Sequence, residues 1–302
     1  MTKARTKQEP EKLLVAQTLS EALPFMRRFK GRTFVIKFGG HAMGDDNLAD
    51  LFARDVVLLK HVGINPVVVH GGGPQIGDML RRLRIKSSFV DGLRVTDSAT
   101  VEIVEMVLAG SINKQVVTAI NRAGGCAVGL SGKDAKLISA IPLERTSKDP
   151  DSQIEKVLDL GFVGHPSRID PTVLNKFASA DIIPVIAPIG LGEKGQTFNI
   201  NADTVAGAIA SAVGAAKLVM MTDVEGLMDG SGKLVPRLTE VEAAAMLHDG
   251  TISGGMIPKI ETCVAAIQGK TEAAHILDGR VPHVLLLEIF TEHGVGTMIK
   301  SE

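Results

Sequence analysis

The sequence has no tryptophan and no tyrosine, and aromatic residues make up 3% of its 302 residues. Proteins usually hold single-stranded nucleic acid by stacking its bases on aromatic rings, so this class of partner is disfavoured. An excess of charge of one sign is also missing, since 33 lysines and arginines stand against 34 aspartates and glutamates. This balance predicts neither a nucleic-acid partner nor an anionic membrane partner.

Cysteine is scarce as well. Cys126 and Cys263 are far apart and lack the spacing of a metal site, so we interpret them as reduced core thiols. No stretch reaches the roughly 18 uninterrupted apolar residues of a membrane span. Residues 1–10 mix charged side chains with no apolar run behind them, unlike a secretory signal. We therefore expect a cytoplasmic protein.

Runs rich in valine and isoleucine alternate with helical patterns along the chain. The patterns predict strands at residues 33–38, 65–70, 126–130, 181–189 and 217–222, and helices at 47–61, 74–84, 101–123 and 202–214. This alternation favours an α/β fold, a three-layer αβα sandwich with a mostly parallel central sheet. Ligands in such sheets bind beyond the carboxyl ends of strands. Three predicted strands end in glycine-containing turns, at residues 39–40, 71–73 and 190–195.

No flexible linker divides the middle of the chain. We interpret the polar residues 144–153 as a surface excursion and place a boundary between two lobes near residues 190–195. Residues 12–30 predict a helix with Pro24 inside it, which we expect to kink. The pattern alone leaves two interpretations open. This helix is either a frayed terminal arm or an amphipathic helix that buries its apolar stripe against another subunit.

The sequence contains no Walker-type phosphate loop and no dinucleotide-binding fingerprint. Phosphate chemistry would therefore need another cradle. Lys37 ends a predicted strand directly before Gly39 and Gly40, and glycine amides beside a lysine suit a phosphate. A solvated residue at a strand end is the alternative interpretation of Lys37.

A second glycine turn follows the strand that ends at His70. Gly71, Gly72 and Gly73 precede a predicted helix that starts near Pro74, and bare amides at a helix N-terminus bind anions. A tight turn without a ligand is the alternative. We assign His70 no chemistry.

Three further segments carry polar residues suited to a small anionic substrate. In residues 91–96, Arg94 is a candidate to clamp a carboxylate through two hydrogen bonds, although a lone arginine is more often a solvated surface residue. In residues 198–203, alternation would point Asn199, Asn201 and Asp203 to one side, although the local pattern alone favours a pair of turn residues and a helix cap. In residues 253–259, a glycine pair precedes a predicted helix that carries Lys259, and an ordinary loop before a solvated helix is the alternative.

Taken together and in this order, these segments resemble the amino-acid kinase family over residues 31–302. The strings VHGGGP, DGLRVT and FNINAD resemble its acetylglutamate branch. The resemblance implies ATP-dependent phosphorylation of the γ-carboxylate of N-acetyl-L-glutamate in arginine biosynthesis. It also implies that Lys37 and Lys259 neutralise the transferring phosphoryl group and that Asp203 holds both lysines. Mg²⁺ is expected on the oxygens of ATP, with no dedicated protein metal site.

The resemblance assigns binding residues as well. It implies that the acyl substrate contacts Gly72, Gly73, Arg94 and Asn199, and that the nucleotide contacts Gly39, Gly40, Asp223, Gly226, Leu227 and Ser253. Phosphoryl transfer requires in-line placement and neutralisation of spreading negative charge. A carboxylate nucleophile is already ionised near pH 7, so no general base is expected.

Residues 275–280 and 292–297 resemble the arginine-inhibited members of the family, whose terminal helices interlace three dimers into a hexamer. This implies a helical arm for oligomerisation at residues 1–30, an N-lobe at 31–190 for acetylglutamate binding and dimerisation, and a C-lobe at 191–302 for ATP and arginine. Phe25 stands where that subgroup often has tyrosine. The inhibitor arginine is expected near Lys217, His275, Glu288 and Gly294.

Three other interpretations remain. A kinase of the same fold would act on another acyl-amino acid, such as an aminoadipate derivative. A non-catalytic amino-acid sensor is disfavoured because Lys37, Asp203 and Lys259 occur together. A bifunctional acetylglutamate synthase and kinase is not expected, because the sequence stops at Glu302 with no room for an acetyltransferase domain.

Overall fold

The computed structural model describes residues 9–90, 92–148, 155–292 and 294–301. At its centre is an eight-stranded sheet with the strand order β14-β16-β15-β13-β1-β2-β10-β5. Six neighbouring strands run parallel to one another, and β16 runs antiparallel to β15. The prediction of a mostly parallel sheet is confirmed. The strands are β14 (Arg237–Thr239), β16 (Thr297–Lys300), β15 (Ala273–Asp278), β13 (Lys217–Thr222), β1 (Thr33–Phe38), β2 (Asn65–His70), β10 (Ile183–Ala187) and β5 (Ala127–Ser131).

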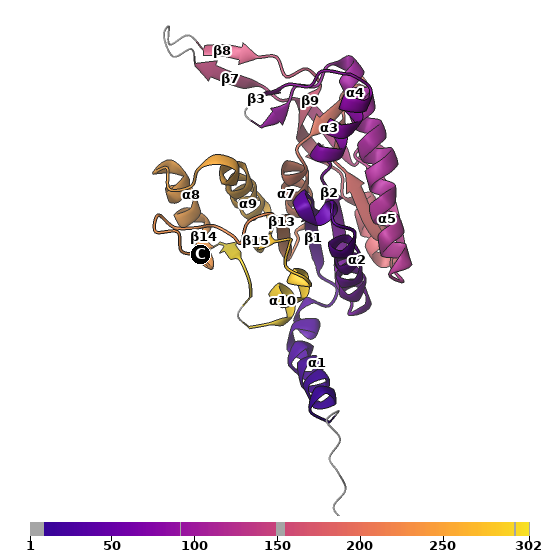
Figure 1. Ribbon diagram of the computed structural model, residues 1–302, viewed down its shortest axis with the longest axis vertical. Coiled ribbons are helices and arrows are strands. Elements are labelled where there is room, and N and C mark those ends of the chain that lie inside the picture. Colours follow the sequence, from indigo (N-terminus) through magenta and orange to yellow (C-terminus); the bar gives the residue numbers. More distant parts are fainter. Residues whose placement is uncertain (1–8, 91, 149–154, 293, 302) are drawn as a thin grey trace, which may run out of the picture.

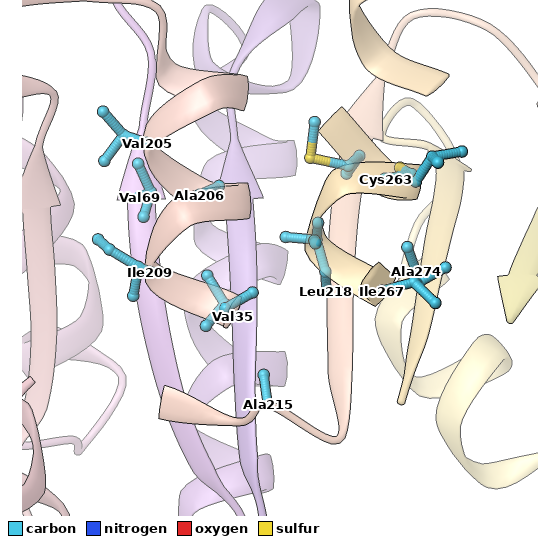
Figure 2. Packing of buried hydrophobic residues seen from close by; sticks show 14 of the residues in the cluster. Val35, Val69, Val205, Ala206, Ile209, Ala215, Leu218, Cys263, Ile267 and Ala274 are labelled. Carbon is cyan, nitrogen blue, oxygen red and sulfur yellow. The ribbon is translucent and has the colours of Figure 1, made fainter. Parts of the chain in front are cut away.

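Helices cover both faces of this sheet (Figure 1). α7 (Ala202–Val213) and α9 (Ile257–Gly269) pack on one face, and α2 (Asp46–His61), α5 (Asn113–Arg122) and α10 (Val284–Phe290) pack on the other. Side chains alternate between the faces of a strand. Val35 of β1 therefore joins the first core, while its neighbours Phe34 and Ile36 join the second. Figure 2 shows Val35 beside Ile209 of α7 in the first core.

Smaller elements complete the chain. α3 (Gly73–Arg82) follows β2, α6 (Thr172–Ser179) precedes β10, and α8 (Glu240–His248) packs beside α9. The small sheets consist of a closed barrel of β6 (Ile138–Pro142), β9 (Val163–Ile169), β11 (Ile189–Leu191) and β12 (Thr197–Ile200), and the hairpins β3 (Phe89–Val90)–β4 (Leu93–Arg94) and β7 (Arg145–Lys148)–β8 (Glu155–Leu158). Strand β7 lies within the predicted surface excursion, and residues 149–153 of that excursion lie outside the described part of the chain.

The predicted strand over residues 181–189 was too long. β10 ends at Ala187, and after Pro188 the chain continues as β11 in the barrel. Proline has no N–H group to donate to a sheet ladder, which explains the break. As a result the glycines of residues 190–195 lie in β11 and in its turn to β12, and they do not line the cleft where the other two glycine turns meet.

The predicted helix over residues 101–123 is longer and interrupted. It comprises α4 (Ser98–Glu105), a π-helical segment (Met106–Ile112) and α5. Among the described residues, this stretch is the one helix that passes a length-and-composition test for a membrane span. Its buried side chains, including Val104, Leu108 and Ile120, pack into the cores of this same chain, so we interpret it as a covering helix of the sheet.

The predicted N-terminal helix is present as α1 (Glu9–Phe29), with Pro24 inside it. It extends from the body of the molecule (Figure 1). Five of its apolar side chains are more than half exposed, namely Leu13, Leu14, Val15, Leu19 and Leu23. Residues 1–8 of the predicted arm lie outside the described residues. The role of the arm and the lobe boundary near residue 190 stay predictions.

Candidate active site

Three charged side chains from distant parts of the sequence meet at one place. The Nζ atom of Lys37 lies 3.1 Å from Oδ1 of Asp203, and the Nζ atom of Lys259 lies 2.6 Å from Oδ2. Lys37 is near the carboxyl end of β1, whereas Asp203 and Lys259 lie in the first turns of α7 and α9. One carboxylate therefore bridges two ammonium groups that different elements supply.

The cluster is partly shielded from water. The side chains of Lys37 and Asp203 are 11% and 10% exposed, and that of Lys259 is 22% exposed. Burial alone would raise the pKa of Asp203, but the charges and hydrogen bonds of Lys37 and Lys259 hold that pKa below its ordinary value. Asp203 is thus ionised near pH 7. Two positive charges against one negative charge suit an incoming anion.

Asn201 places Asp203 in this cluster. The side-chain oxygen of Asn201 accepts hydrogen bonds from the backbone N–H groups of Asp203 and Thr204, at 2.8 and 3.3 Å. It is therefore Asn201 that caps the N-terminus of α7, and Asp203 lies within the helix. This capping leaves the carboxylate of Asp203 to the lysines. Asn199, Asn201 and Asp203 all line one cavity of about 250 Å³.

Glycine turns form another wall of that cavity. Gly71, Gly72 and Gly73 line it at the N-terminus of α3, and Gly40 lines it near the end of β1. Gly40 has a φ of +70°, and a Cβ there would lie 2.5 Å from Oδ1 of Asp223. Only glycine avoids both the strain and the collision. Gly39 does not line the cavity, but a Cβ there would lie 2.9 Å from Nζ of Lys37.

Arg94 lies in the same cavity on strand β4. Its guanidinium group donates to the carbonyl oxygen of Gly73 at 3.1 Å and to the hydroxyl of Ser87, and lies 4.5 Å from the ring centre of Phe89. Sequence reasoning missed Ser87 and Phe89, although their position in the β3–β4 segment beside Arg94 was a usable clue. Asp91, the first residue of the predicted motif, lies outside the described residues.

The residues predicted for the nucleotide are placed less compactly. Asp223 lies beside Gly40, and the N–H group of Leu227 donates to Oγ1 of Thr297 at 2.8 Å. The side chain of Leu227 is 3% exposed and packs into the core. Gly226 approaches Thr297, and Ser253 precedes the helical segment that leads to Lys259 without capping it. None of these four residues lines the 250 Å³ cavity.

The residues predicted for arginine form a second cluster. The ammonium group of Lys217 lies 2.9 Å from Nε2 of His275 and 3.3 Å from Oε1 of Glu288. An ammonium group only donates, so Nε2 of His275 accepts and the proton is on Nδ1, which lies 2.8 Å from Glu288. Burial lowers the pKa of His275, which keeps the imidazole neutral near pH 7. A Cβ on Gly294 would lie 2.5 Å from Oε2 of Glu288.

A cavity of about 690 Å³ adjoins this cluster. Lys217, Glu288 and Gly294 line it, together with Phe25 and Phe29 of α1. His275 does not line the cavity, but it contacts Lys217 and Glu288, which do. The structure thus brings the four predicted residues together beside α1.

Known proteins resemble this chain in sequence. A family model described as the amino acid kinase family matches residues 32–278. An acetylglutamate kinase of Rhodospirillum centenum is 65% identical, with 96% of this chain and 95% of that protein aligned. An acetylglutamate kinase of Rhodospirillum rubrum is 66% identical, with 95% and 92% aligned.

Known structures resemble the fold. An N-acetylglutamate synthase from Neisseria gonorrhoeae, solved in complex with coenzyme A and N-acetyl-glutamate, superposes with a TM-score of 0.81 at 25% identity. The alignment covers 95% of this chain and 63% of the synthase chain. This chain therefore spans less than two thirds of the length of that protein.

Proposed function

Because the chain belongs to the amino acid kinase family and is a phosphoryl-transferring enzyme, we propose that its acceptor is N-acetyl-L-glutamate. ATP phosphorylates the γ-carboxylate and yields N-acetyl-L-glutamyl 5-phosphate and ADP, a step of arginine biosynthesis. The support for this substrate is that relatives with 65% and 66% identity are acetylglutamate kinases.

The convergence of Lys37, Asp203 and Lys259 carries the proposal. In the transition state of phosphoryl transfer, negative charge spreads over the transferring group and must be neutralised. Two ammonium groups within 3.1 Å of one buried carboxylate are held in place before the reaction, so little reorganisation is needed. The acceptor carboxylate is ionised near pH 7 and attacks without a general base.

The cavity of about 250 Å³ supports a small acyl-amino acid as the acceptor. The amides of Gly72 and Gly73 at the N-terminus of α3 favour an anionic group. Arg94 supplies a fork-shaped cation for the α-carboxylate, and Asn199 supplies an amide for the remaining polar atoms.

The phosphates of the nucleotide meet the acceptor at the lysines, where Gly40 and Lys37 line the same cavity as the acceptor residues. Gly39 and Gly40 contact its phosphates, and Asp223, Gly226, Leu227 and Ser253 contact the rest of ATP. ATP would carry Mg²⁺, which would supply further neutralisation of the phosphate charge beside Lys37 and Lys259. The described residues include no group of three or more histidine, cysteine, aspartate or glutamate side chains suited to a metal ion, and the proposal needs none.

We also propose feedback inhibition by arginine in a hexamer built as a trimer of dimers in the cytoplasm. The exposed apolar side chains of α1 support an association surface. The acidic Glu288 in the 690 Å³ cavity beside α1 supports a cationic ligand. Inhibition requires that arginine bind one arrangement of the enzyme more tightly than another. Phe25 lines this cavity without the hydroxyl that tyrosine would offer.

The experiment is an assay of ADP release with N-acetyl-L-glutamate as acceptor, with and without arginine. We expect ADP release that requires the acceptor and falls when arginine is added. An N-acylated aminoadipate serves as the competing acceptor. Faster turnover of the aminoadipate compound would reject the proposed substrate, and no turnover of either compound would favour a sensor.

A further inference from the structure

A fully buried histidine adjoins the glycine turn of the site. His70 is the last residue of β2, and its Nδ1 atom lies 2.8 Å from the carbonyl oxygen of Gly71. A carbonyl oxygen only accepts, so Nδ1 carries the proton and donates. Burial lowers the pKa of His70 to about 4, which leaves the ring neutral near pH 7 and Nε2 as an acceptor.

Asn113 supplies the donor for that acceptor. Its Nδ2 atom lies 3.3 Å from Nε2 of His70, 2.9 Å from the carbonyl oxygen of Val185 and 3.4 Å from that of Leu130. These partners belong to β2, β10 and β5, which are adjacent in the sheet. Lys114 donates to Oδ1 of Asn113 at 3.1 Å. One buried side chain of the covering helix therefore ties three adjacent strands to the glycine turn.

The π-helical segment brings Asn113 to this point. The N–H group of Asn113 donates to the carbonyl oxygen of Leu108, one residue further back than in an α-helix. Such widened turns are frequent at functional sites. A Cβ on Gly72 would lie 2.5 Å from Cδ1 of Ile112 and 2.6 Å from Cδ2 of Leu108, so this segment also packs directly on the glycine turn.

Gly129 of β5 leaves room for the amide. A Cβ at Gly129 would lie 1.8 Å from Oδ1 of Asn113, a distance that no real contact shows. The side-chain amide of Asn113 is thus hydrogen-bonded through both its nitrogen and its oxygen, and the missing side chain of Gly129 leaves the space for it. A buried polar network of this kind fixes geometry more sharply than an apolar contact does.

We propose that His70 and Asn113 are positioning residues that fix Gly71, whose N–H group donates to the carbonyl oxygen of Phe38 at 2.8 Å, and so orient the amides of Gly72 and Gly73 toward the acceptor substrate. The inference deepens the proposed function and rests on it. Neither side chain lines the 250 Å³ cavity, so both act through the turn. An effect on the acceptor without an effect on ATP is therefore the expected signature.

The test compares His70→Leu, Asn113→Ala and Gly129→Ala with Val68→Ala. Val68 is a fully buried residue of the same strand, two positions before His70, and packs in the hydrophobic core, so it controls for a loss of packing. Steady-state kinetics with N-acetyl-L-glutamate and with ATP give two KM values for each variant. Hydrogen exchange of the unliganded protein reports the opening of the Gly71 amide, which is hydrogen-bonded to the carbonyl oxygen of Phe38.

We expect the KM for N-acetyl-L-glutamate to rise about ten-fold in the three variants, because small misplacements of binding groups have large effects. The KM for ATP should stay within about two-fold, and exchange of the Gly71 amide should be about ten-fold faster. Val68→Ala should change neither KM. A rise of both KM values together, or unchanged amide exchange, would overturn the proposal.

His70→Asn and Gly129→Ala keep the test decisive if His70→Leu does not fold. His70→Asn retains a donor close to the position of Nδ1 and should restore most of the KM for the acceptor. Gly129→Ala displaces Asn113 without changing His70 and should reproduce the defect of Asn113→Ala. Wild-type protein that releases no ADP with N-acetyl-L-glutamate would reject the proposed function, while the amide exchange would still decide whether His70 and Asn113 hold the turn.

Discussion

Asp203 is the residue on which the charge arrangement of the site depends. It neutralises one of two ammonium groups and is itself kept ionised by both, since their charges and hydrogen bonds outweigh the effect of burial on its pKa. The remaining positive charge attracts the phosphates of ATP and the carboxylates of the acceptor. Each of the two lysines is then expected to act in the transition state.

Replacing Lys37 tests this arrangement most directly. We expect Lys37→Ala to lower turnover about a hundred-fold or more, because it removes a preorganised donor and leaves Asp203 paired with Lys259 alone. Turnover is measured as ADP release at saturating substrates.

Lys60 provides a matched control. It is also buried, at 8% exposure, and donates to Oδ1 of Asn65 and to the carbonyl oxygen of Ala178, away from the cavity. Lys60→Ala should lower thermal stability and leave turnover of the folded enzyme nearly unchanged. Near-normal turnover in Lys37→Ala would end the assignment of its role.

His70 predicts a pH dependence of stability. Its pKa is about 4 when folded, against about 6.5 in an unfolded chain. Between these values the unfolded state binds the proton and the folded state does not, so stability is complete above pH 6.5 and falls as the pH drops toward 4.

The expected size of this effect is about 2 kcal/mol between pH 7 and pH 5. Urea unfolding at the two pH values measures it, with His70→Asn as the comparison. The decrease in the free energy of unfolding should be about 2 kcal/mol smaller in the variant. An equal decrease in both proteins would show that His70 does not titrate in this way.

At the scale of elements, the contact between the glycine turn and the π-helical segment has its own prediction. Gly72→Ala would place a methyl group against Ile112 and Leu108, at 2.5 and 2.6 Å. We expect the free energy of unfolding to fall by about 1–3 kcal/mol, as in overpacked cores, and the KM for the acceptor to rise. At Gly73 a Cβ would meet nothing within 4 Å, so Gly73→Ala should unfold like the wild type.

Local sequence patterns correctly predicted the elements that have a simple apolar period. The strand over residues 217–222 and the helix over 47–61 were predicted with nearly the observed bounds, because each has a continuous apolar pattern of one period. The π-helical segment was missed, since a wider turn changes hydrogen bonding without changing the apolar pattern. The break at Pro188 was also missed, although proline gave a local reason for it.

Local sequence patterns were limited in the same way at the candidate active site. The glycine turns, Arg94 and the Lys37, Asp203 and Lys259 set were named from motifs, and their convergence could be inferred only through the family resemblance. Asn113 and Gly129 carry no motif. Asn113 lies 43 positions after His70 in the sequence, and it meets Gly129 through a steric fit, so neither contact leaves a local pattern in the sequence.

At the scale of the whole molecule, α1 has a row of apolar side chains that the rest of the described chain leaves exposed. Its side chains Leu13, Leu14 and Leu19 are 61–68% exposed, while Phe29 at its end is buried in the core. A helix with such an uncovered stripe gains from association. α1 also lines the cavity proposed for arginine, which would couple assembly to inhibition.

Removing residues 1–28 tests this coupling. We expect the truncated protein to form dimers whose turnover ignores arginine, whereas the intact protein forms hexamers. Light scattering after size exclusion measures the mass, and the ADP assay measures inhibition. In the intact chain, Leu19→Asp should weaken assembly more than Ser20→Asp, which changes an exposed polar residue one position along. A hexamer that survives the truncation would refute the role of the arm.

The central sheet combines strands that precede the predicted lobe boundary near residue 190 with strands that follow it. β1 pairs with β2 on one side and with β13 on the other, and Lys37 of β1 reaches Asp203 of α7. A backbone cut within residues 190–195 would thus leave β1 of one fragment and β13 of the other with bare edges. We expect such fragments to aggregate when produced separately and to reassemble when produced together in one cell, where recovered ADP release would show the reassembly.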